Sequence, residues 1–379
     1  MILTSKNNLI KPTPIIQKLL RSQKLGLESY FEEQMENNNM IYLDKNENPF
    51  APPLRLIEPS DIIDYLRLYP DPSTSDFLNN LALQLNIPSS YLLAGSGSDD
   101  LLDLIIRTYA TRNVKILGVS PSFSMYEFYA KINGAEYISL PLILRLNQKT
   151  GIAQYELNQS NFINKAKDSK IIILARPNNP DGMVFRRDFI IKLLGLNKLV
   201  IIDEAYIDFS DKPSLIDLIQ RYDNLIITRS FSKSYSLAGL RLGYIIANPQ
   251  IINVLNQVKS PYNVNNIALK FGVILINNQS QIMKNITKVK SIRKEFCDDL
   301  MELLVNHKKF YYHPSEANFV LLRGQSIEII QLLYDYFLKY NFKLRKFKGQ
   351  LENCLRISIG TKSQMKKVIE IIDTFLGGR

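Results

Sequence analysis

One stretch of the chain sets a lysine and an arginine among small hydroxyl residues. The apolar run 225–227 predicts a buried strand, and Lys233 and Arg241 lie in the serine-rich segment 228–244 that includes its end. A desolvated lysine has a lowered pKa, and its neutral amine can form a Schiff base with an aldehyde. A guanidinium binds a phosphate through two parallel hydrogen bonds. The stretch therefore predicts a site for a phosphorylated aldehyde. A surface lysine between an ordinary strand and helix is the alternative interpretation.

Pyridoxal phosphate is the phosphorylated aldehyde that these two groups fit, and four further residues could complete its site. Asp203 ends an apolar run, and a carboxylate in a dry site would keep the pyridine nitrogen protonated. Tyr206 and Asn179 could donate to the phenolate oxygen of the ring, and Tyr126 could stack on its face. Each residue alone also suits a cap, a turn or the edge of a core. Together, however, they lie at the ends of successive predicted strands, and each supplies a group that the cofactor needs. This combination favours the cofactor site.

The segment 92–106 is another candidate for phosphate binding. Its apolar start gives way to the small residues 95–98, and an amphipathic helix is predicted to begin at Ser98 and Asp99. The backbone N–H groups at a helix start bind phosphate readily. An ordinary N-cap is the alternative for this segment read alone.

The candidate residues follow short apolar or β-branched runs that alternate with helical patterns, such as 189–196. The runs are 114–119, 136–140, 171–175, 199–203, 225–228 and 242–247. This alternation predicts an α/β fold with a mainly parallel sheet flanked by helices on both faces. Open sheets of this kind bind ligands at the carboxyl ends of their strands, which is where the candidate residues fall.

The pattern changes after residue 265. Helices are predicted at 267–276, 281–304 and 363–376, and short strands at 319–322, 343–345 and 355–359, which suggests a smaller α+β domain. We therefore expect three parts. They are an N-terminal arm and helix (1–43) in the small domain or a dimer contact, a large cofactor-binding domain (44–265) and the small domain (266–379).

Composition limits the possible partners. The chain has 379 residues, of which 46% are hydrophobic, and a formal net charge of +11. Its basic residues form no long run, which favours steering of an anionic metabolite over binding of nucleic acid. Cys297 and Cys354 form no CxxC pair, and two histidines cannot make a three-histidine site, so we expect a reducing compartment and no metal. No signal-peptide pattern and no apolar run of about 18 residues occur, which predicts a soluble, cytoplasmic protein.

The segment 230–244 resembles the lysine motif of the fold-type I, pyridoxal-phosphate-dependent aminotransferases, a resemblance that implies a seven-stranded sheet in the large domain. Within that family the chain is most similar to the histidinol-phosphate aminotransferases. The similarity covers nearly all of the chain from Asp44 onward. Its other motifs lie at 46–49, 69–71, 95–99, 177–180, 203–206, 260–264, 317–319 and 355–357.

The resemblance implies a role for each residue around the cofactor ring. Lys233 would hold pyridoxal phosphate covalently and shuttle the proton of the substrate. Asp203 would pair with the pyridine nitrogen, Asn179 and Tyr206 would bond the ring oxygen, and Tyr126 would stack on the ring.

The resemblance also assigns residues to the phosphates and the substrate. Tyr69 would reach the cofactor phosphate of the neighbouring subunit, which implies a homodimer. Arg356 would clamp the substrate carboxylate, and Arg345 would lie near the distal phosphate of the substrate. The remaining assignments are Ser98, Asp99, Ser230 and Arg241 for the cofactor phosphate and Asn48 for the substrate.

The implied reaction is transamination between L-histidinol phosphate and 2-oxoglutarate, which gives imidazole-acetol phosphate and L-glutamate in histidine biosynthesis. Alternatives with the same cofactor site are an aromatic or other amino-acid aminotransferase and a decarboxylase of a phosphorylated amino acid such as threonine phosphate. A nucleic-acid-binding regulator, suggested by the net charge, is the alternative from another class.

The chain departs from the family pattern at Asp181, where threonine is usual, at Arg176, at Asp100 and in the segment 11–14, which lacks a tyrosine.

Overall fold

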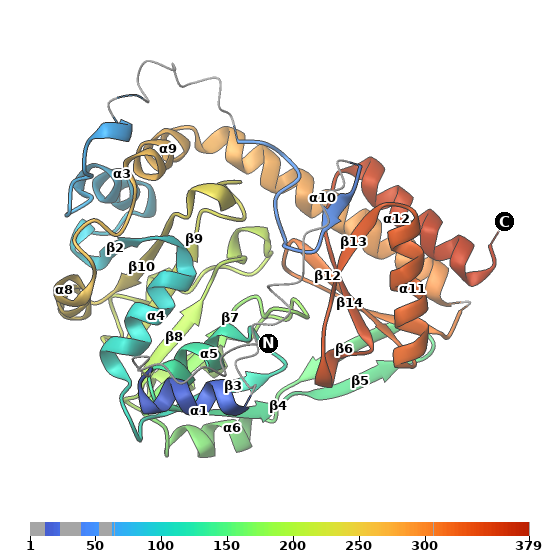
Figure 1. Cartoon of the computed structure of the whole chain (residues 1–379), viewed down its shortest axis with the longest axis horizontal. Coiled ribbons are helices and arrows are strands. Elements are labelled where there is room, and N and C mark those ends of the chain that lie inside the picture. The colour runs from blue at the N-terminus through green and yellow to red at the C-terminus, as the bar shows by residue number, and fades with distance from the viewer. Residues whose placement is uncertain (1–11, 23–38, 53–62, 64, 306, 379) are drawn as a thin grey trace, which may run out of the picture.

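A computed structural model describes residues 12–22, 39–52, 63, 65–305 and 307–378 (Figure 1). The strands of these residues form two seven-stranded sheets, each in its own layered unit. The long helix α10 (Gln279–Val305) begins beside the first unit and packs along the second.

The first sheet confirms the predicted, mainly parallel α/β architecture. Strands β4, β3, β7, β8 and β9 are parallel to one another, whereas β10 is antiparallel to both β9 and β2. In spatial order the strands are β2 (Leu92–Gly95), β10 (Gly243–Ala247), β9 (Leu225–Ser230), β8 (Leu199–Asp203), β7 (Ile171–Ala175), β3 (Lys115–Ser120) and β4 (Glu136–Pro141).

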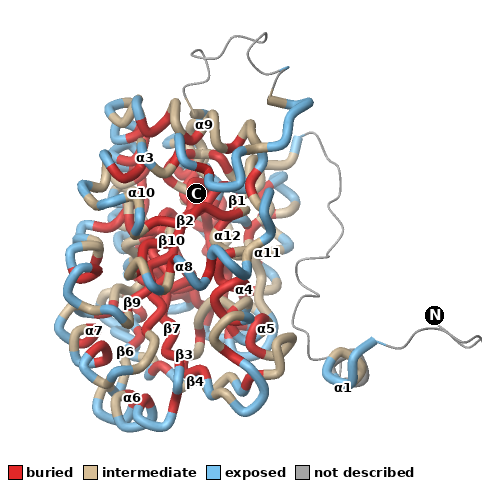
Figure 2. Tube along the Cα trace, turned by 90° about the vertical axis from the view of Figure 1, so that its left-hand side faces the viewer, coloured by how far each residue is buried: buried red, intermediate tan, exposed pale blue. Residues whose placement is uncertain are grey.

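Helices cover both faces of this sheet, so nearly every residue of its central strands is buried. Ile171 and Ile173 of β7 pack on one side, and Ile172 and Leu174 pack on the other. The sequences of these strands are therefore continuous apolar runs rich in β-branched residues. In a half-exposed sheet, apolar and polar residues would alternate along each strand. Figure 2 shows β7, β9 and β10 buried inside the unit. One face carries α4 (Gly97–Tyr109), α5 (Met125–Ile132) and α8 (Pro249–Val258), and the other carries α6 (Gln159–Ala166) and α7 (Arg187–Leu194).

The second sheet takes strands from three distant parts of the chain. The predicted strands at 319–322, 343–345 and 355–359 are confirmed as β12 (Phe319–Gly324), β13 (Phe342–Lys346) and β14 (Cys354–Ser358). The hairpin of β5 (Ile143–Asn147) and β6 (Ile152–Glu156) was not predicted. It pairs with β11 (Phe310–His313) at one edge, while β1 (Ile41–Leu43) pairs in parallel with β13 at the other. The predicted domain boundaries stay a prediction.

The remaining helices pack on or between the two units. The predicted helices at 267–276, 281–304 and 363–376 are confirmed as α9 (Asn266–Asn277), α10 and α12 (Lys362–Leu376), and α11 (Ile327–Lys339) was not predicted. Near the N-terminus, α1 (Pro14–Ser22) contacts α5, and much of the predicted arm lies outside the described residues. The other elements are α3 (Ser75–Leu85) and short 3-10 turns at Ser89–Tyr91, Ile207–Phe209, Ile216–Leu218, Ala238–Leu240 and Gly349–Leu351.

Candidate active site

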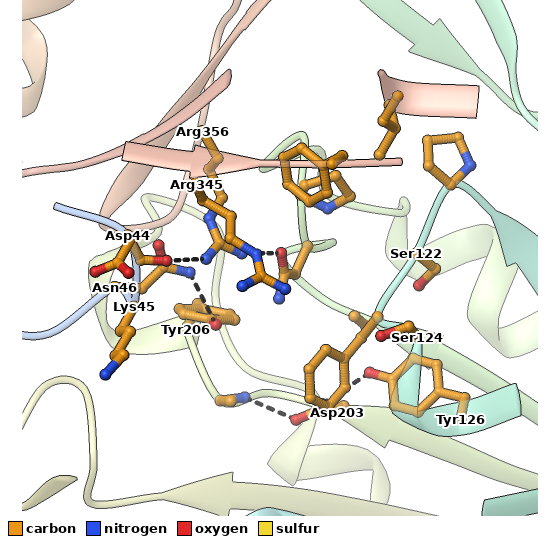
Figure 3. Close-up of a pocket in the computed structure, with 18 of the residues that line it drawn as sticks. Asp44, Lys45, Asn46, Ser122, Ser124, Tyr126, Asp203, Tyr206, Arg345 and Arg356 are labelled. Carbon is orange, nitrogen blue, oxygen red and sulfur yellow. Dashed lines mark hydrogen bonds between the residues drawn. The ribbon is translucent and has the colours of Figure 1, made fainter. Parts of the chain in front are cut away.

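A cavity of about 710 Å³ lies where the carboxyl ends of β3, β7, β8 and β9 meet β13 and β14 (Figure 3). Parallel strands end at one edge of their sheet, so the residues that follow them converge there. The cavity brings together most of the predicted site residues, namely Ser98, Asp99, Tyr126, Asn179, Asp203, Tyr206, Ser230, Lys233, Arg241, Arg345 and Arg356.

Lys233 lies in the turn after β9 and lines the cavity. Its Nζ donates a 2.9 Å hydrogen bond to the backbone oxygen of Lys45 and lies 5.8 Å from the centre of the Tyr206 ring. Burial, and then the positive charge of Arg356, lower the pKa of Lys233 from 10.5 to about 8. At neutral pH roughly a tenth of this amine is therefore uncharged and able to attack an aldehyde.

Asp203 is the last residue of β8 and is buried at the floor of the cavity. Its Oδ2 accepts a 2.7 Å hydrogen bond from the Tyr126 hydroxyl, and its Oδ1 accepts from Ala205 N (3.1 Å) and Thr228 Oγ1 (3.2 Å). Burial raises the pKa of Asp203 to about 6, against the opposing effect of the Tyr126 hydrogen bond. The carboxyl is therefore mostly ionised at neutral pH, in the form that can bind a protonated ring nitrogen.

A cradle for an anion lies at the start of α4. Gly97, at φ 85°, begins the helix, and a Cβ atom there would lie 2.6 Å from Nη2 of Arg241. Only glycine leaves room for that guanidinium beside the helix N-terminus. Arg241 Nη1 also donates to Ser232 Oγ at 3.3 Å, and Arg241 Nη2 lies 3.4 Å from Asp99 Oδ2.

Arg356 reaches from β14 to the edge of the first sheet. Its Nη1 donates a 2.6 Å hydrogen bond to Asn179 Oδ1, and its Nη2 donates to the backbone oxygen of Asp44 at 2.8 Å. Arg345 of β13 is the register partner of Arg356 and also lines the cavity. These two guanidinium groups give the wall formed by the second sheet an affinity for anions.

Asn46 was not predicted individually, although it lies within the matching motif 46–49. It adopts φ 55°, a left-handed conformation that asparagine tolerates, and its Nδ2 donates to the Tyr206 hydroxyl at 3.1 Å. The hydroxyl of Ser358 and the amide of Asn318 hold Asn46 in place. The signal that could have identified it is an asparagine, a residue that tolerates the left-handed conformation, in the polar turn that follows β1.

Two predicted residues do not line the cavity. Asn48 instead donates through Nδ2 to the backbone oxygens of Lys233 (3.1 Å) and Ser234 (3.3 Å), so it supports the turn that carries Lys233. Tyr69 is 82% exposed and stacks on Tyr262, with ring centres 4.7 Å apart. Their predicted roles in binding stay predictions.

The chemistry of the cavity fits pyridoxal phosphate. Its amine at Lys233 suits the aldehyde, its buried carboxylate at Asp203 suits the ring nitrogen, and its cradle at Gly97 and Arg241 suits the phosphate. Within the described residues, no group of three or more His, Cys, Asp or Glu side chains could hold a metal ion.

Comparisons with known proteins agree with this chemistry. The sequence matches the family described as aminotransferase class I and II over residues 38–372. The histidinol-phosphate aminotransferase of Flavobacterium psychrophilum is 34% identical over 365 residues, which cover 94% of this chain and 98% of that protein. Its counterpart from Flavobacterium johnsoniae is 36% identical over 342 residues, which cover 89% of this chain and 90% of that protein.

A solved structure shows the same fold. The crystal structure of histidinol-phosphate aminotransferase from Sinorhizobium meliloti, in complex with pyridoxal-5'-phosphate, has a TM-score of 0.78 at 19% identity and matches 98% of this chain and 99% of that chain. Its fold is that of the present structure, and the family match spans both sheets. The chain therefore belongs to the class I and II aminotransferases and is a pyridoxal-phosphate-dependent enzyme of that family.

Proposed function

We propose that this aminotransferase converts L-histidinol phosphate and 2-oxoglutarate into imidazole-acetol phosphate and L-glutamate. The relatives from two Flavobacterium species, which carry this activity in their names, support the proposal over nearly the full length of the chain. The observation that carries it is the pairing of Arg345 with Arg356 in the cavity wall, because two guanidinium groups suit substrates that carry a phosphate or two carboxylates.

Lys233 would do the proton chemistry of this reaction. Pyridoxal phosphate, when bound, supplies the aldehyde that carries the amino group and a ring that withdraws electrons from the reacting carbon. The neutral Nζ of Lys233 would accept the proton from Cα of the substrate and later return it. The lowered pKa of Lys233 supports this role, since an ordinary lysine is almost fully protonated at neutral pH.

The remaining residues would hold the reactants in place. Asp203 would keep the ring nitrogen protonated, and its orientation is fixed by the hydroxyl of Tyr126. Asn179 and Tyr206 would donate to the ring oxygen, each from a side chain that a neighbour already orients. Arg356 would bind the carboxylate of glutamate or the corresponding oxyanion of the phosphorylated substrate.

A homodimer is part of the proposal. Tyr69 is exposed next to two exposed leucines, Leu66 and Leu68, which is an arrangement that a partner subunit would cover. If Tyr69 serves the site of the partner subunit, mixing a Lys233→Ala variant with a Tyr69→Ala variant should restore activity through heterodimers with one intact site. If Tyr69 served its own site, mixing would restore nothing. Sedimentation of the wild type measures the oligomeric state itself.

A cytoplasmic location is also proposed. Both cysteines, Cys297 and Cys354, are free, which is usual in a reducing compartment. Among the helices described, none is long and apolar enough to cross a membrane. Nucleic acid is not proposed as a partner, and a gel shift that persists at moderate salt would contradict this.

The substrate assignment is tested by the two half-reactions, followed separately through the absorbance of the bound cofactor. Holoenzyme mixed with histidinol phosphate, or with glutamate, should convert the cofactor to its amino form without a second substrate. The amino form should return to the aldehyde form with 2-oxoglutarate or imidazole-acetol phosphate. If glutamate converts the cofactor and histidinol phosphate does not, the chain is an aminotransferase of another substrate.

A further inference from the structure

The cavity wall formed by β13, the loop after it and β14 carries several cations and no opposing charge. Of the described residues in the segment 342–358, no carboxylate lines the cavity. Like charges that line one wall of a cavity repel one another, and an anion that binds between them relieves this repulsion. The cationic lining residues of this wall are Lys343, Arg345, Lys346, Lys348 and Arg356.

The pleat of β13 aligns two of these cations. Phe342 and Leu344 are buried in the core, so Lys343 and Arg345 project from the opposite face of the strand, and both line the cavity. Residues two apart on one strand are about 7 Å from each other. Because Arg345 is also the register partner of Arg356, the three cations follow one another across neighbouring strands.

Lys343 and Lys346 differ in what their ammonium groups contact. Lys346 donates to Gln331 and lies 5.2 Å from the centre of the Tyr334 ring, so its ammonium is turned toward α11. Lys343 has no hydrogen-bond or ion-pair partner among the residues that the structure describes. Lys343 therefore has a charge that no described residue neutralises, at the edge of the cavity proposed to bind substrate.

A phosphoryl group fits this arrangement better than a carboxylate does. A phosphate monoester carries a charge of about −1.5 to −2 and three acceptor oxygens, whereas one arginine fork already satisfies the two oxygens of a carboxylate. We propose that Lys343 is a specificity-determining residue that binds the phosphoryl group of the substrate together with Arg345. This inference rests on the proposed function and extends it, because it assigns the preference for phosphorylated substrates to a lysine outside the family's motifs.

The test compares Lys343→Gln with wild-type holoenzyme in the separate half-reactions. KM for histidinol phosphate should rise about tenfold, as expected for loss of one charged hydrogen bond, while kcat changes less than about twofold. KM for glutamate should stay within about twofold, since Arg356 remains. The discrimination between histidinol phosphate and histidinol should fall by the same factor of about ten, and Lys343→Arg should restore most of it.

Lys339→Gln is the matched control, because Lys339 on α11 carries the same charge and does not line the cavity. It should behave as wild type in both half-reactions. The inference would be overturned if Lys343→Gln left KM for histidinol phosphate unchanged. It would equally be overturned if KM for glutamate rose as much as KM for histidinol phosphate, or if Lys339→Gln had the same effect.

A second probe separates this inference from the proposed function. Inorganic phosphate should inhibit the glutamate half-reaction of the wild-type holoenzyme competitively, and Lys343→Gln should raise its inhibition constant about tenfold. If histidinol phosphate is not converted but this difference in inhibition is observed, the proposed substrate fails while the phosphoryl site stands. If histidinol phosphate is converted and phosphate inhibits both proteins equally, the role of Lys343 fails while the proposed function stands.

Discussion

The Tyr126 hydroxyl donates a 2.7 Å hydrogen bond to Oδ2 of Asp203, and both side chains are buried. Tyr126 lies in the first turn of α5, after β3, whereas Asp203 ends β8, so this bond links a helix start to a strand end at the same edge of the sheet. A buried carboxylate needs such donors to remain ionised. The bond therefore favours a negative charge on Asp203, the residue that we propose to pair with a pyridinium nitrogen.

Replacement of Asp203 by asparagine tests that charge. Asp203→Asn can still accept from Tyr126 but cannot hold the ring nitrogen protonated, so kcat for transamination should fall by about a hundredfold or more. Tyr126→Phe removes only one hydrogen bond and should lower kcat by no more than about tenfold. Thermal unfolding of both variants, measured in parallel, checks that they are folded. Equal losses of kcat in the two variants would mean that the charge of Asp203 is not what matters.

The pH dependence of cofactor loading reports on Lys233. The pKa of this lysine is lowered to about 8, so its neutral fraction, and with it the rate of covalent loading onto the apoprotein, should rise with pH through about 8. Arg356→Gln removes a positive neighbour that favours the neutral amine, so the midpoint should move to higher pH. Arg345→Gln is the control, because Arg345 is not among the causes of the shift. A midpoint that stays in place in Arg356→Gln would contradict this electrostatic coupling.

Gly97 tests the anion cradle. Gly97→Ala should raise the dissociation constant of pyridoxal phosphate more than about tenfold, because the new Cβ would displace the guanidinium of Arg241. Gly377→Ala is the matched control. Gly377 also has positive φ, 96° against 85°, but a Cβ there meets nothing within 4 Å. Both variants should lose about 1 kcal/mol of folding stability through backbone strain, and only Gly97→Ala should lose cofactor affinity. Weakened binding in both would point to strain alone.

Asp181 should make the stability of the apoprotein depend on pH. Burial raises the pKa of Asp181 from 3.8 to about 7, although Asn178 donates to it at 2.6 Å. The folded state therefore binds a proton that the unfolded state releases, so the free energy of unfolding should decrease as pH rises from about 4 to about 7. The full effect is on the order of 4 kcal/mol.

The variant Asp181→Asn removes this titration and should flatten the dependence over the same interval, as measured by urea unfolding at several pH values. Asp203 contributes a change of the same sign, because its pKa is also raised, so a smaller decrease should remain. A variant whose unfolding free energy depends on pH as strongly as that of the wild type would show that Asp181 is ionised in the folded protein.

The sequence allowed the first sheet and its reactive edge to be predicted for a simple reason. Asp203 ends one continuous apolar run and Lys233 lies shortly after another, and runs of this kind that alternate with helices are typical of parallel strands, which end at one edge of their sheet. Their side chains therefore had to converge once the sheet formed. This inference needed no knowledge of which helix packs where.

The second sheet was harder to predict because its pairing is not local. Strand β1 pairs with β13 about 300 residues later in the chain, a partner that no local pattern indicates, and β5 is largely exposed, so its sequence shows no buried apolar face. For the same reason Lys343 gave no signal. It is one lysine among many until β13 is placed beside β14 at the mouth of the cavity.

The most direct test of the account is the position of the cofactor after reduction of the wild-type holoenzyme with borohydride. Digestion and mass spectrometry should find pyridoxal phosphate attached to the peptide that contains Lys233, and Lys233→Ala should carry no label at that position. Attachment of the cofactor to another lysine in the wild type, with Lys233 unmodified, would contradict the assignment of the active site.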